Sequence, residues 1–363
     1  MKKSLYLLFL FSTLTSFVLG TLMGQYYPQI RSRLRSTINR WDNTERMVWP
    51  DAFSEVRIPS SADGTKQHAY FLKAVSGLPK PLVVSLHSWS GDYSQNDALA
   101  NLAAGEGWNY IHPDFRGPNW IADSCLSDRV ISDIDDAIQY AIDNGNVDLS
   151  NVFVVGASGG GYATLGAYLK TRHQVKAFLS WVPISDLVAW YHQSKHRESK
   201  YAQDILKCTS GGTFLNENEA KSRSPLFWDV PERPKGRLEI YAGINDGYTG
   251  SVPISHSILF FNHVARQLGN QDDLVEQNDI IGLLTRGLDE RNDLGMLGTR
   301  NTYYRREIDS LLLVIFQGSH EMLPEYCFER IKMIAEQGAS LELPKCKTGT
   351  VTNFETGDVY LIK

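Results

Sequence analysis

The segment at residues 151–170, NVFVVGASGGGYATLGAYLK, constrains the fold more than any other part of the sequence. Its apolar run at 152–155 is typical of a central parallel strand that is covered on both faces. The run GASGG at 156–160 comes next, and residues 161–170 have helical composition. A Gly-x-Ser-x-Gly pattern at such a turn strains the serine backbone and lifts the Ser158 hydroxyl clear of the sheet. The same residues could form a plain glycine-rich loop. Ser158 can therefore be a nucleophile only if the rest of the chain supplies a base, an acid and an oxyanion hole.

Strand-like and helical segments alternate along most of the chain. This alternation predicts an α/β fold with a mostly parallel, twisted sheet and helices on both faces. In such sheets, ligands bind beyond the carboxyl ends of the strands. Strands are predicted at residues 81–86, 108–111, 152–155, 177–182, 238–242 and 311–316, and an amphipathic helix at 128–144. Two stretches, 187–236 and 270–309, break the alternation and are predicted to be insertions near that edge of the sheet.

Two further residues with suitable chemistry follow predicted strand ends. Asp246 comes just after the strand at 238–242, and His320 just after the strand at 311–316. The chain order Ser158, Asp246, His320 is that of the α/β-hydrolase fold. In this arrangement the histidine removes the serine proton and the aspartate fixes the imidazole tautomer. Asp186 is the one serious competitor for the acid, and Asp246 is preferred because its loop follows the next-to-last strand.

An oxyanion hole is predicted beside the serine. The strand at 81–86 runs into the loop HSWSG at 87–91. Hydrolases of this fold take one backbone N–H from this loop and the other from the residue after the nucleophile. The second donor is therefore Gly159, and the first is predicted to be Trp89, with Ser88 as the alternative.

Four segments together resemble a known family. VVGASGGGYATLGA, KSRSPLFW, YAGINDGYTGSVPISHS and FQGSHEM are similar to the catalytic domain of prolyl oligopeptidase-like serine hydrolases, over roughly residues 81–330. The resemblance implies an α/β-hydrolase fold, with Ser158 as nucleophile, Asp246 as acid and His320 as base. Acyl transfer through these residues needs no metal or other cofactor, and none is expected.

The family resemblance leaves the substrate open. Peptidases of this kind carry a β-propeller, and the roughly 80 residues before the first predicted strand are too few to build one. Many secreted relatives without a propeller resemble acyl esterases acting on polysaccharides. We therefore predict a serine esterase that cleaves short acyl esters on a carbohydrate, with a serine peptidase acting on short peptides as the alternative. A non-catalytic binding module on the same scaffold is a third possibility, against which the intact triad argues.

Three residues are candidates for substrate contacts. Trp190 and Trp228, in the first predicted insertion, offer flat rings that could stack on a sugar. Arg116, after the strand at 108–111, could clamp an acidic group of the substrate or pair within its own loop. Nucleic acid is not expected as a partner, because the net charge is −5 and the body of the chain has no long basic run.

The N-terminus differs from the rest of the chain. Lys2 and Lys3 precede an apolar stretch at 5–19, which is typical of a secretory signal peptide. Residues 1–20 are predicted to be this signal, 21–48 a linker, and 49–363 the catalytic domain. The protein is then secreted or periplasmic. Because the apolar run can be extended to Met23, an uncleaved membrane anchor facing outside the cytoplasm is the alternative.

Export would make the four cysteines candidates for disulfide bonds. An even number in an oxidising compartment favours pairing, and four cysteines can pair in three ways. Cys327 and Cys346 are close in sequence, while Cys125 and Cys208 are both expected in loops at the same edge of the sheet. The favoured pairs are therefore Cys125–Cys208 and Cys327–Cys346. No Cys-x-x-Cys spacing is present, which makes zinc a poor alternative.

Overall fold

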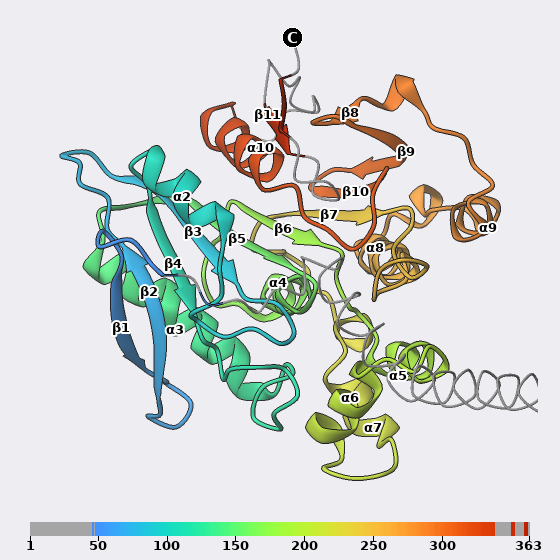
Figure 1. Cartoon of the computed structure of the whole chain (residues 1–363), viewed down its shortest axis with the longest axis horizontal. Helices are drawn as coiled ribbons and strands as arrows, with labels where there is room; N and C mark the ends of the chain where they lie inside the picture. Colours follow the sequence, from blue (N-terminus) through green and yellow to red (C-terminus); the bar gives the residue numbers. More distant parts are fainter. Residues whose placement is uncertain (1–45, 47, 338–349, 353–358, 362–363) are drawn as a thin grey trace, which may run out of the picture. The chain divides into compact units, whose positions relative to one another are not determined.

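A ten-stranded sheet forms the centre of the domain (Figure 1). The computed structural model describes residues 46, 48–337, 350–352 and 359–361, all within the unit Thr44–Lys363. The strand order is β1-β2-β4-β3-β5-β6-β7-β10-β9-β8. The strand bounds are β1 Ser54–Pro59, β2 Lys66–Leu72, β3 Lys80–Leu86, β4 Asn109–Pro113, β5 Val147–Ala157, β6 Ala177–Trp181, β7 Arg237–Gly243, β8 Met296–Leu297, β9 Arg300–Ile308 and β10 Leu311–Phe316. A separate pair, β11 Thr350–Thr352 and β12 Val359–Leu361, is antiparallel.

The middle of the sheet is parallel and its edges are antiparallel. Neighbouring strands from β4 to β10 run in the same direction, whereas β1, β2 and β9 pair antiparallel with their neighbours. Every residue of β4, β6, β7 and β10 is buried, as expected for strands that are covered on both faces, and β10 is accordingly a continuous apolar run. The predicted mostly parallel sheet is confirmed.

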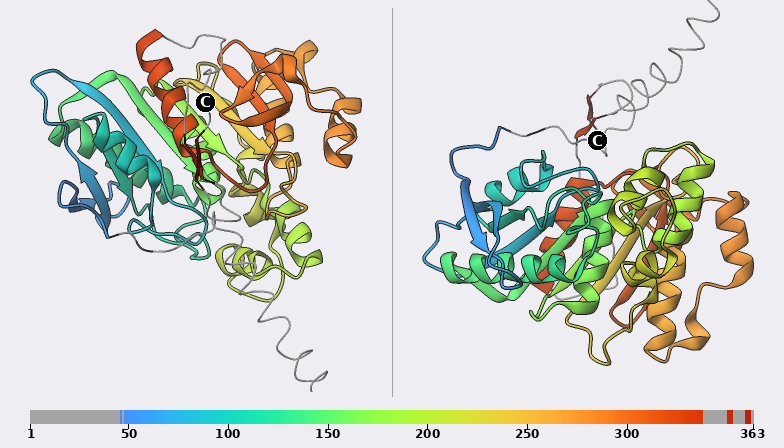
Figure 2. Two further views of the ribbon diagram at one scale, coloured as in Figure 1. Left: turned by 45° about the horizontal axis from the view of Figure 1, so that its top comes forward. Right: turned by 90° about the horizontal axis from the view of Figure 1, so that it is seen from below.

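Helices cover both faces of the sheet, as the two views in Figure 2 show. On one side α10 packs against α2 and β6, and Trp108 contacts Phe328 of α10 with ring centroids 5.3 Å apart. On the other side α4 packs against β5 and β6, with α3 and α8 beside it. The bounds are α2 Ala98–Gly105, α3 Asp128–Asn144, α4 Gly159–Lys170, α8 Ser255–Gln267 and α10 Pro324–Gln337.

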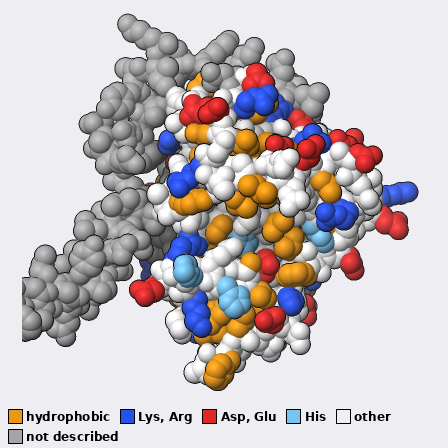
Figure 3. Space-filling model, turned by 90° about the vertical axis from the view of Figure 1, so that its right-hand side faces the viewer, with side chains coloured by type: hydrophobic (Ala, Val, Ile, Leu, Met, Phe, Trp, Pro, Cys, Tyr) orange, Lys and Arg blue, Asp and Glu red, His pale blue; other side chains and the backbone are white. Residues whose placement is uncertain are grey.

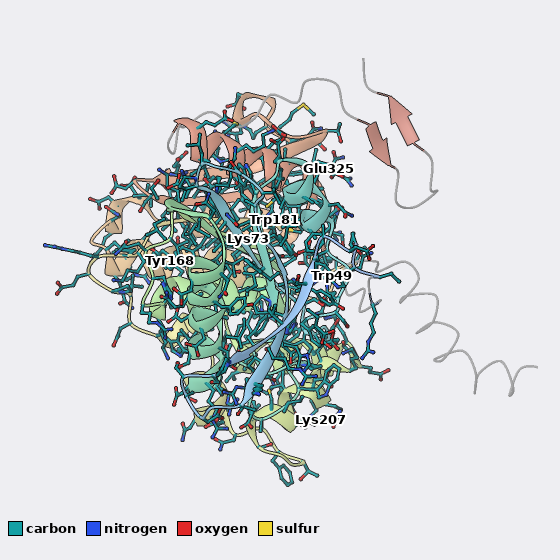
Figure 4. The ribbon with its side chains drawn as sticks, turned by 90° about the vertical axis from the view of Figure 1, so that its left-hand side faces the viewer. Trp49, Lys73, Tyr168, Trp181, Lys207 and Glu325 are labelled. Carbon is teal, nitrogen blue, oxygen red and sulfur yellow. The ribbon has the colours of Figure 1, made fainter. Side chains whose placement is uncertain are left out.

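The sequence analysis missed the hairpin at the amino-terminal edge of the sheet. Trp49, just before β1, stacks on Tyr70 of β2 with ring centroids 4.4 Å apart, and Figure 4 places it beside this hairpin. The same figure labels Tyr168 on α4 and Trp181 on β6, and both side chains are fully buried. The domain core therefore extends from the hairpin to β10.

The first predicted insertion is helical. It contains α5 Leu187–His196, α6 Tyr201–Thr209, α7 Glu217–Ser222 and the short turn η2 Pro225–Phe227, and it connects β6 to β7. We call residues 187–236 the α5–α7 segment.

The second predicted insertion is only partly one. It contains η3 Gln271–Asp273, α9 Gln277–Thr285 and η4 Asn292–Leu294, but it ends in β8 and β9, which extend the sheet. The prediction that 270–309 lies outside the alternation is wrong for β9. Because this strand lies near the edge of the sheet, it can carry charged residues. Two of them pair, with Arg305 Nη2 donating to Glu307 Oε2 at 2.8 Å. The face that carries α9 mixes acidic, basic and hydrophobic side chains (Figure 3).

The predictions for the N-terminus fall outside the described residues. The signal and most of the linker belong to residues 1–45, and Cys346 also lies in a part of the chain that is not described. Among the residues that the structure does describe, no helix has the length and apolar character needed to cross a bilayer.

Candidate active site

Ser158 occupies the turn between β5 and α4 with strained backbone angles, φ 58° and ψ −116°. The glycines around it are required by close backbone contacts. A Cβ on Gly156 would lie 2.3 Å from the carbonyl carbon of Gly160, and a Cβ on Gly160 would lie 2.1 Å from the oxygen of Leu86. The Ser158 amide donates to Trp181 O at 2.9 Å, which fixes the turn to β6. The residue thus has the geometry of a nucleophile held above the sheet.

The three residues predicted as a triad lie together at the carboxyl ends of β5, β7 and β10. His320 Nε2 is 2.8 Å from Ser158 Oγ, and His320 Nδ1 is 2.7 Å from Asp246 Oδ2. Because an ionised carboxylate only accepts, Nδ1 carries the proton and Nε2 is left to accept from the serine hydroxyl. All three side chains are buried, with Ser158 only 3% exposed. This tautomer is the one that a general base needs.

Asp246 is held by backbone amides. Its Oδ1 accepts from Gly247 N at 2.9 Å and from Val252 N at 3.0 Å, while Oδ2 faces His320. The competitor Asp186 has a different position. It caps the start of α5, where its carboxylate accepts from Val188 N at 2.8 Å and from Ala189 N. The geometry therefore favours Asp246 as the partner of the histidine.

Two backbone amides converge beside the serine. A Cβ on Gly159 would lie 2.2 Å from Trp89 N, which shows how closely the two predicted oxyanion donors approach. In the described part of the chain, neither amide meets an acceptor. The alternative donor Ser88 is occupied, since its amide donates to Gln95 Oε1 at 2.9 Å. The arrangement can accept a negatively charged oxygen between Trp89 and Gly159.

Two residues that the sequence analysis missed hold this oxyanion loop. Gln95 binds both the amide and the hydroxyl of Ser88. His87, 1% exposed, has Nδ1 2.9 Å from Ser88 O and Nε2 2.7 Å from Asp114 O. His87 stands at the exit of a predicted strand and could have been found from that position. Gln95 belongs to no motif, and nothing in the sequence indicates it.

Trp190 does not form a substrate surface. Its side chain is fully buried, and its Nε1 donates to Ser251 O at 2.9 Å. The ring packs edge-on against Trp89 at 4.8 Å and stacks on Tyr201 at 4.8 Å. The prediction that it stacks on a sugar is wrong for this structure, because both sides of the ring are already covered by aromatic neighbours.

The prediction that Trp228 stacks on a sugar is also wrong for this structure. The side chain lies under Lys170, whose Nζ is 3.5 Å from the ring centroid, and its Nε1 donates to Ser222 O. Lys170 ends α4, whereas Ser158 precedes its first residue. Twelve helical residues span about 18 Å. Trp228 therefore packs at the end of α4 that is remote from the nucleophile.

Arg116 pairs inside the protein, the second of its two predicted roles. Nε is 2.5 Å from Asp133 Oδ2 on α3, and Nη1 is 2.8 Å from Asp63 Oδ2 in the β1–β2 turn. Its hydrogen bond holds the pKa of Asp63 well below the usual range. The guanidinium links three parts of the fold and is not offered to a substrate.

The predicted disulfide bonds are absent from the described residues. Cys125, Cys208 and Cys327 are buried free thiols. Cys125 and Cys208 are neighbours, and burial together with a hydrogen bond between them raises the pKa of the Cys208 thiol well above its usual value. Cys327 lies on α10 beside Trp181, and burial raises its pKa too. Such thiols are stable in the protonated form as small apolar groups of the core.

No cluster of His, Cys, Asp or Glu among the described residues has the arrangement of a metal site. An open hollow of about 700 Å³ lies away from the triad, against β1, β2 and α3, and is lined by residues such as Phe71, Val75 and Tyr140.

Comparisons with known proteins agree with this geometry. The acylaminoacyl peptidase in complex with Z-Gly-Gly-Phe-chloromethyl ketone superposes with a TM-score of 0.55 at 18% identity, over 84% of this chain and 43% of its own. The acylaminoacyl peptidase of Pyrococcus horikoshii gives a TM-score of 0.54 at 18% identity, over 78% of this chain and 40% of its own. These likenesses confirm the α/β-hydrolase fold.

The sequence comparisons identify the family. Dipeptidyl peptidase family member 6 of Caenorhabditis elegans is 24% identical over 197 residues, which are 51% of this chain and 26% of that protein. The chain thus spans about a quarter of the curated relative that it matches and less than half of the solved structures. The sequence pattern of the prolyl oligopeptidase family matches residues 94–277, half of the chain. The chain belongs to the prolyl oligopeptidase family.

Proposed function

We propose that the protein is a serine peptidase that cleaves short peptides through an acyl-enzyme. The observation that carries the proposal is the chain of hydrogen bonds from Ser158 through His320 to Asp246, within a family whose named relatives here are peptidases. The alternative function from the sequence therefore has better support than the carbohydrate esterase. One support for the esterase prediction was that Trp190 and Trp228 could stack on a sugar, and neither ring is available for that role.

The geometry accounts for the first half of the reaction. His320 Nε2 takes the proton of Ser158 Oγ as the oxygen attacks the substrate carbonyl. Asp246 stabilises the imidazolium that forms, and the amides of Trp89 and Gly159 receive the negative charge on the carbonyl oxygen. Removal of one such donor in related chemistry costs about 10²–10³ in kcat.

The second half returns the proton. His320 donates it to the leaving amine, the C–N bond breaks, and the acyl group stays on Ser158. Water then attacks the acyl-enzyme while His320 again acts as base, and the free acid leaves as the serine regains its proton. An amine is a poor leaving group, so its protonation by a correctly held imidazole is the step that separates a peptidase from an enzyme limited to esters.

A substrate panel tests the proposal. It contains aminoacyl and dipeptidyl anilides with a free amine, the same compounds with an acylated amine, and acetylated sugars. The two forms of the amine are included because the named relatives comprise a dipeptidyl peptidase and an acylaminoacyl peptidase. We expect anilide cleavage, with one of the two amine forms preferred, and a higher kcat/KM for the anilides than for any acetylated sugar.

The control is Ser158→Ala with a fluorophosphonate probe. We expect the probe to label the parent and not the variant, and anilide cleavage to disappear in the variant. Preference for acetylated sugars over every anilide would reject the peptidase proposal and restore the esterase. Equal labelling of variant and parent would reject Ser158 as the nucleophile.

A further inference from the structure

One face of α5 is turned toward the loop that holds the catalytic acid. Trp190 and Arg197 are seven residues apart, about two helical turns, and therefore lie on the same side of this helix and its end. Both side chains donate to carbonyl oxygens of residues 247–251, which we call the acid loop. The α5–α7 segment thus reaches the triad through side chains and not through its backbone.

Arg197 makes most of these contacts. Its Nη1 donates to Gly247 O at 2.9 Å and to Gly250 O at 3.1 Å, and its Nη2 donates to Ser251 O at 2.8 Å. Ser251 O also accepts from Trp190 Nε1 at 2.9 Å. The planar guanidinium presents its donors in a fixed fork, so three carbonyls bound at once define the path of the loop.

The acid loop in turn lies directly against the triad. Gly247 N donates to Asp246 Oδ1, and Val252 N, just after the loop, donates to the same oxygen. A Cβ on Gly250 would lie 2.2 Å from Asp246 Oδ1 and 2.6 Å from His320 Cβ. A shift of the loop by a fraction of an ångström would therefore move the carboxylate relative to the imidazole.

We propose that Arg197 is a positioning residue that holds Asp246 in line with His320 by fixing the acid loop. The proposal rests on the proposed function, since it gives Asp246 the role of the acid. In this role Arg197 acts through Asp246, and among the described residues its hydrogen bonds to carbonyls of the acid loop provide the connection. Lysine would keep the positive charge but supply one flexible point of contact in place of the fork.

The test is Arg197→Lys, assayed with the best anilide and by the rate of fluorophosphonate labelling, which depends on no substrate preference. Misplacement of a catalytic group by about 1 Å can cost about 10²-fold in rate. We expect kcat and the labelling rate to fall by about 10²-fold with KM unchanged. In an Asp246→Asn background the same substitution should cost less than about threefold, because the two residues act on one step.

Arg223→Lys is the matched control. Arg223 is also an arginine that binds carbonyls of a loop, with Nη1 2.8 Å from Ala122 O and 2.9 Å from Ser124 O, but that loop carries no triad residue. Its kcat and labelling rate should stay at the parent level. Arg197→Gln provides a second variant if Arg197→Lys does not fold. It removes the fork that binds three carbonyls and should lower kcat at least as much as Arg197→Lys, again with little further loss in the Asp246→Asn background.

Two results would overturn the proposal. One is a rise in KM at unchanged kcat, which would make Arg197 a substrate contact. The other is an equal loss in the parent and Asp246→Asn backgrounds, which would make it a structural residue only. Failure of the proposed function is seen separately, either as preference for acetylated sugars over every anilide or as equal labelling of Ser158→Ala and the parent. Failure of the Arg197 proposal leaves the anilide preference of the parent intact and Ser158→Ala unlabelled.

Discussion

Two neighbouring regions hold the candidate active site by different kinds of contact. In the loops at the strand ends, the chain meets itself through its backbone: an added Cβ on Gly160, after β5, would lie 2.1 Å from Leu86 O at the end of β3, and one on Gly243, at the end of β7, would lie 2.2 Å from Ser319 O after β10. The α5–α7 segment meets these loops through the side chains of Trp190 and Arg197. Backbone contacts leave no room for a larger residue, whereas side-chain contacts can be weakened in steps. The first region should therefore fail abruptly on substitution and the second gradually.

The largest expected effect separates two aspartates, Asp246 in the loop after β7 and Asp186 directly before the α5–α7 segment. Asp246→Asn keeps the shape but removes the charge that stabilises the His320 imidazolium, and by analogy with serine protease triads kcat should fall by about 10⁴. Asp186→Asn should change kcat little, because asparagine caps a helix about as well as aspartate. Steady-state kinetics and Tm of both variants check this. The reverse ranking would transfer the acid to Asp186.

Trp228 tests whether an aromatic residue of the α5–α7 segment that lies far from the acid loop affects stability without affecting catalysis. Trp228→Ala removes a ring that is 8% exposed and lies under Lys170, and the free energy of unfolding should fall by about 3 kcal/mol. Because the ring is at the remote end of α4, kcat/KM at a temperature where the variant is folded should equal that of the parent. Urea denaturation and kinetics measure the two quantities. A fall in kcat/KM with unchanged stability would return Trp228 to the substrate site.

A glycine pair tests how abruptly the backbone contacts fail. Gly160→Ala must displace the β3 end or the start of α4, since its Cβ would lie 2.1 Å from Leu86 O and 2.9 Å from His87 O. Both oxygens belong to the chain that leads into the oxyanion loop, so kcat should fall by about 10²-fold. Gly105→Ala, at the end of α2, is the control because nothing lies within 4 Å of its Cβ. It should leave kcat unchanged and alter stability by at most about 1 kcal/mol. Equal activity of the two variants would contradict the close contact.

The same contrast explains what the sequence could predict. Local signals predicted the parallel sheet, namely the strand ends and the glycines around Ser158. Together with the chain order, they also indicated three residues that the structure places side by side, Ser158, Asp246 and His320. The position of Trp190 depends on which neighbours cover its ring, and Arg197 binds a loop some fifty residues later in the chain. No local sequence pattern indicates the neighbours of Trp190 or the loop that Arg197 binds. The strand β9 was missed because an edge strand can carry charges that a buried strand cannot. Export stays a prediction, since it depends on residues 1–23.

The smallest effect concerns His256, which joins the β6–α5 connection to α8. Its Nδ1 accepts from Ser185 N at 3.2 Å and from Asp186 N at 3.3 Å, and its Nε2 faces Gln193 Oε1 at 3.0 Å. These contacts require a neutral ring with the proton on Nε2. Burial, with a contribution from the charge of Arg197, lowers the pKa of His256 from 6.5 to about 3.

The pH dependence of stability follows from that shift. Between pH 6.5 and 3 the unfolded chain binds a proton at His256 that the folded chain does not, so stability is complete above pH 6.5 and declines as the pH falls toward 3. From pH 7 to pH 5 the loss due to this residue should be about 2 kcal/mol. His256→Gln should be less stable than the parent at pH 7 but should lack this decline, and exposed His196→Gln should retain it. Urea denaturation at pH 7, 6 and 5 measures all three proteins. If the free energy of unfolding fell equally with pH in the parent and in His256→Gln, the ring would not be held neutral. The side-chain contacts around α5 would then be weaker than the structure indicates.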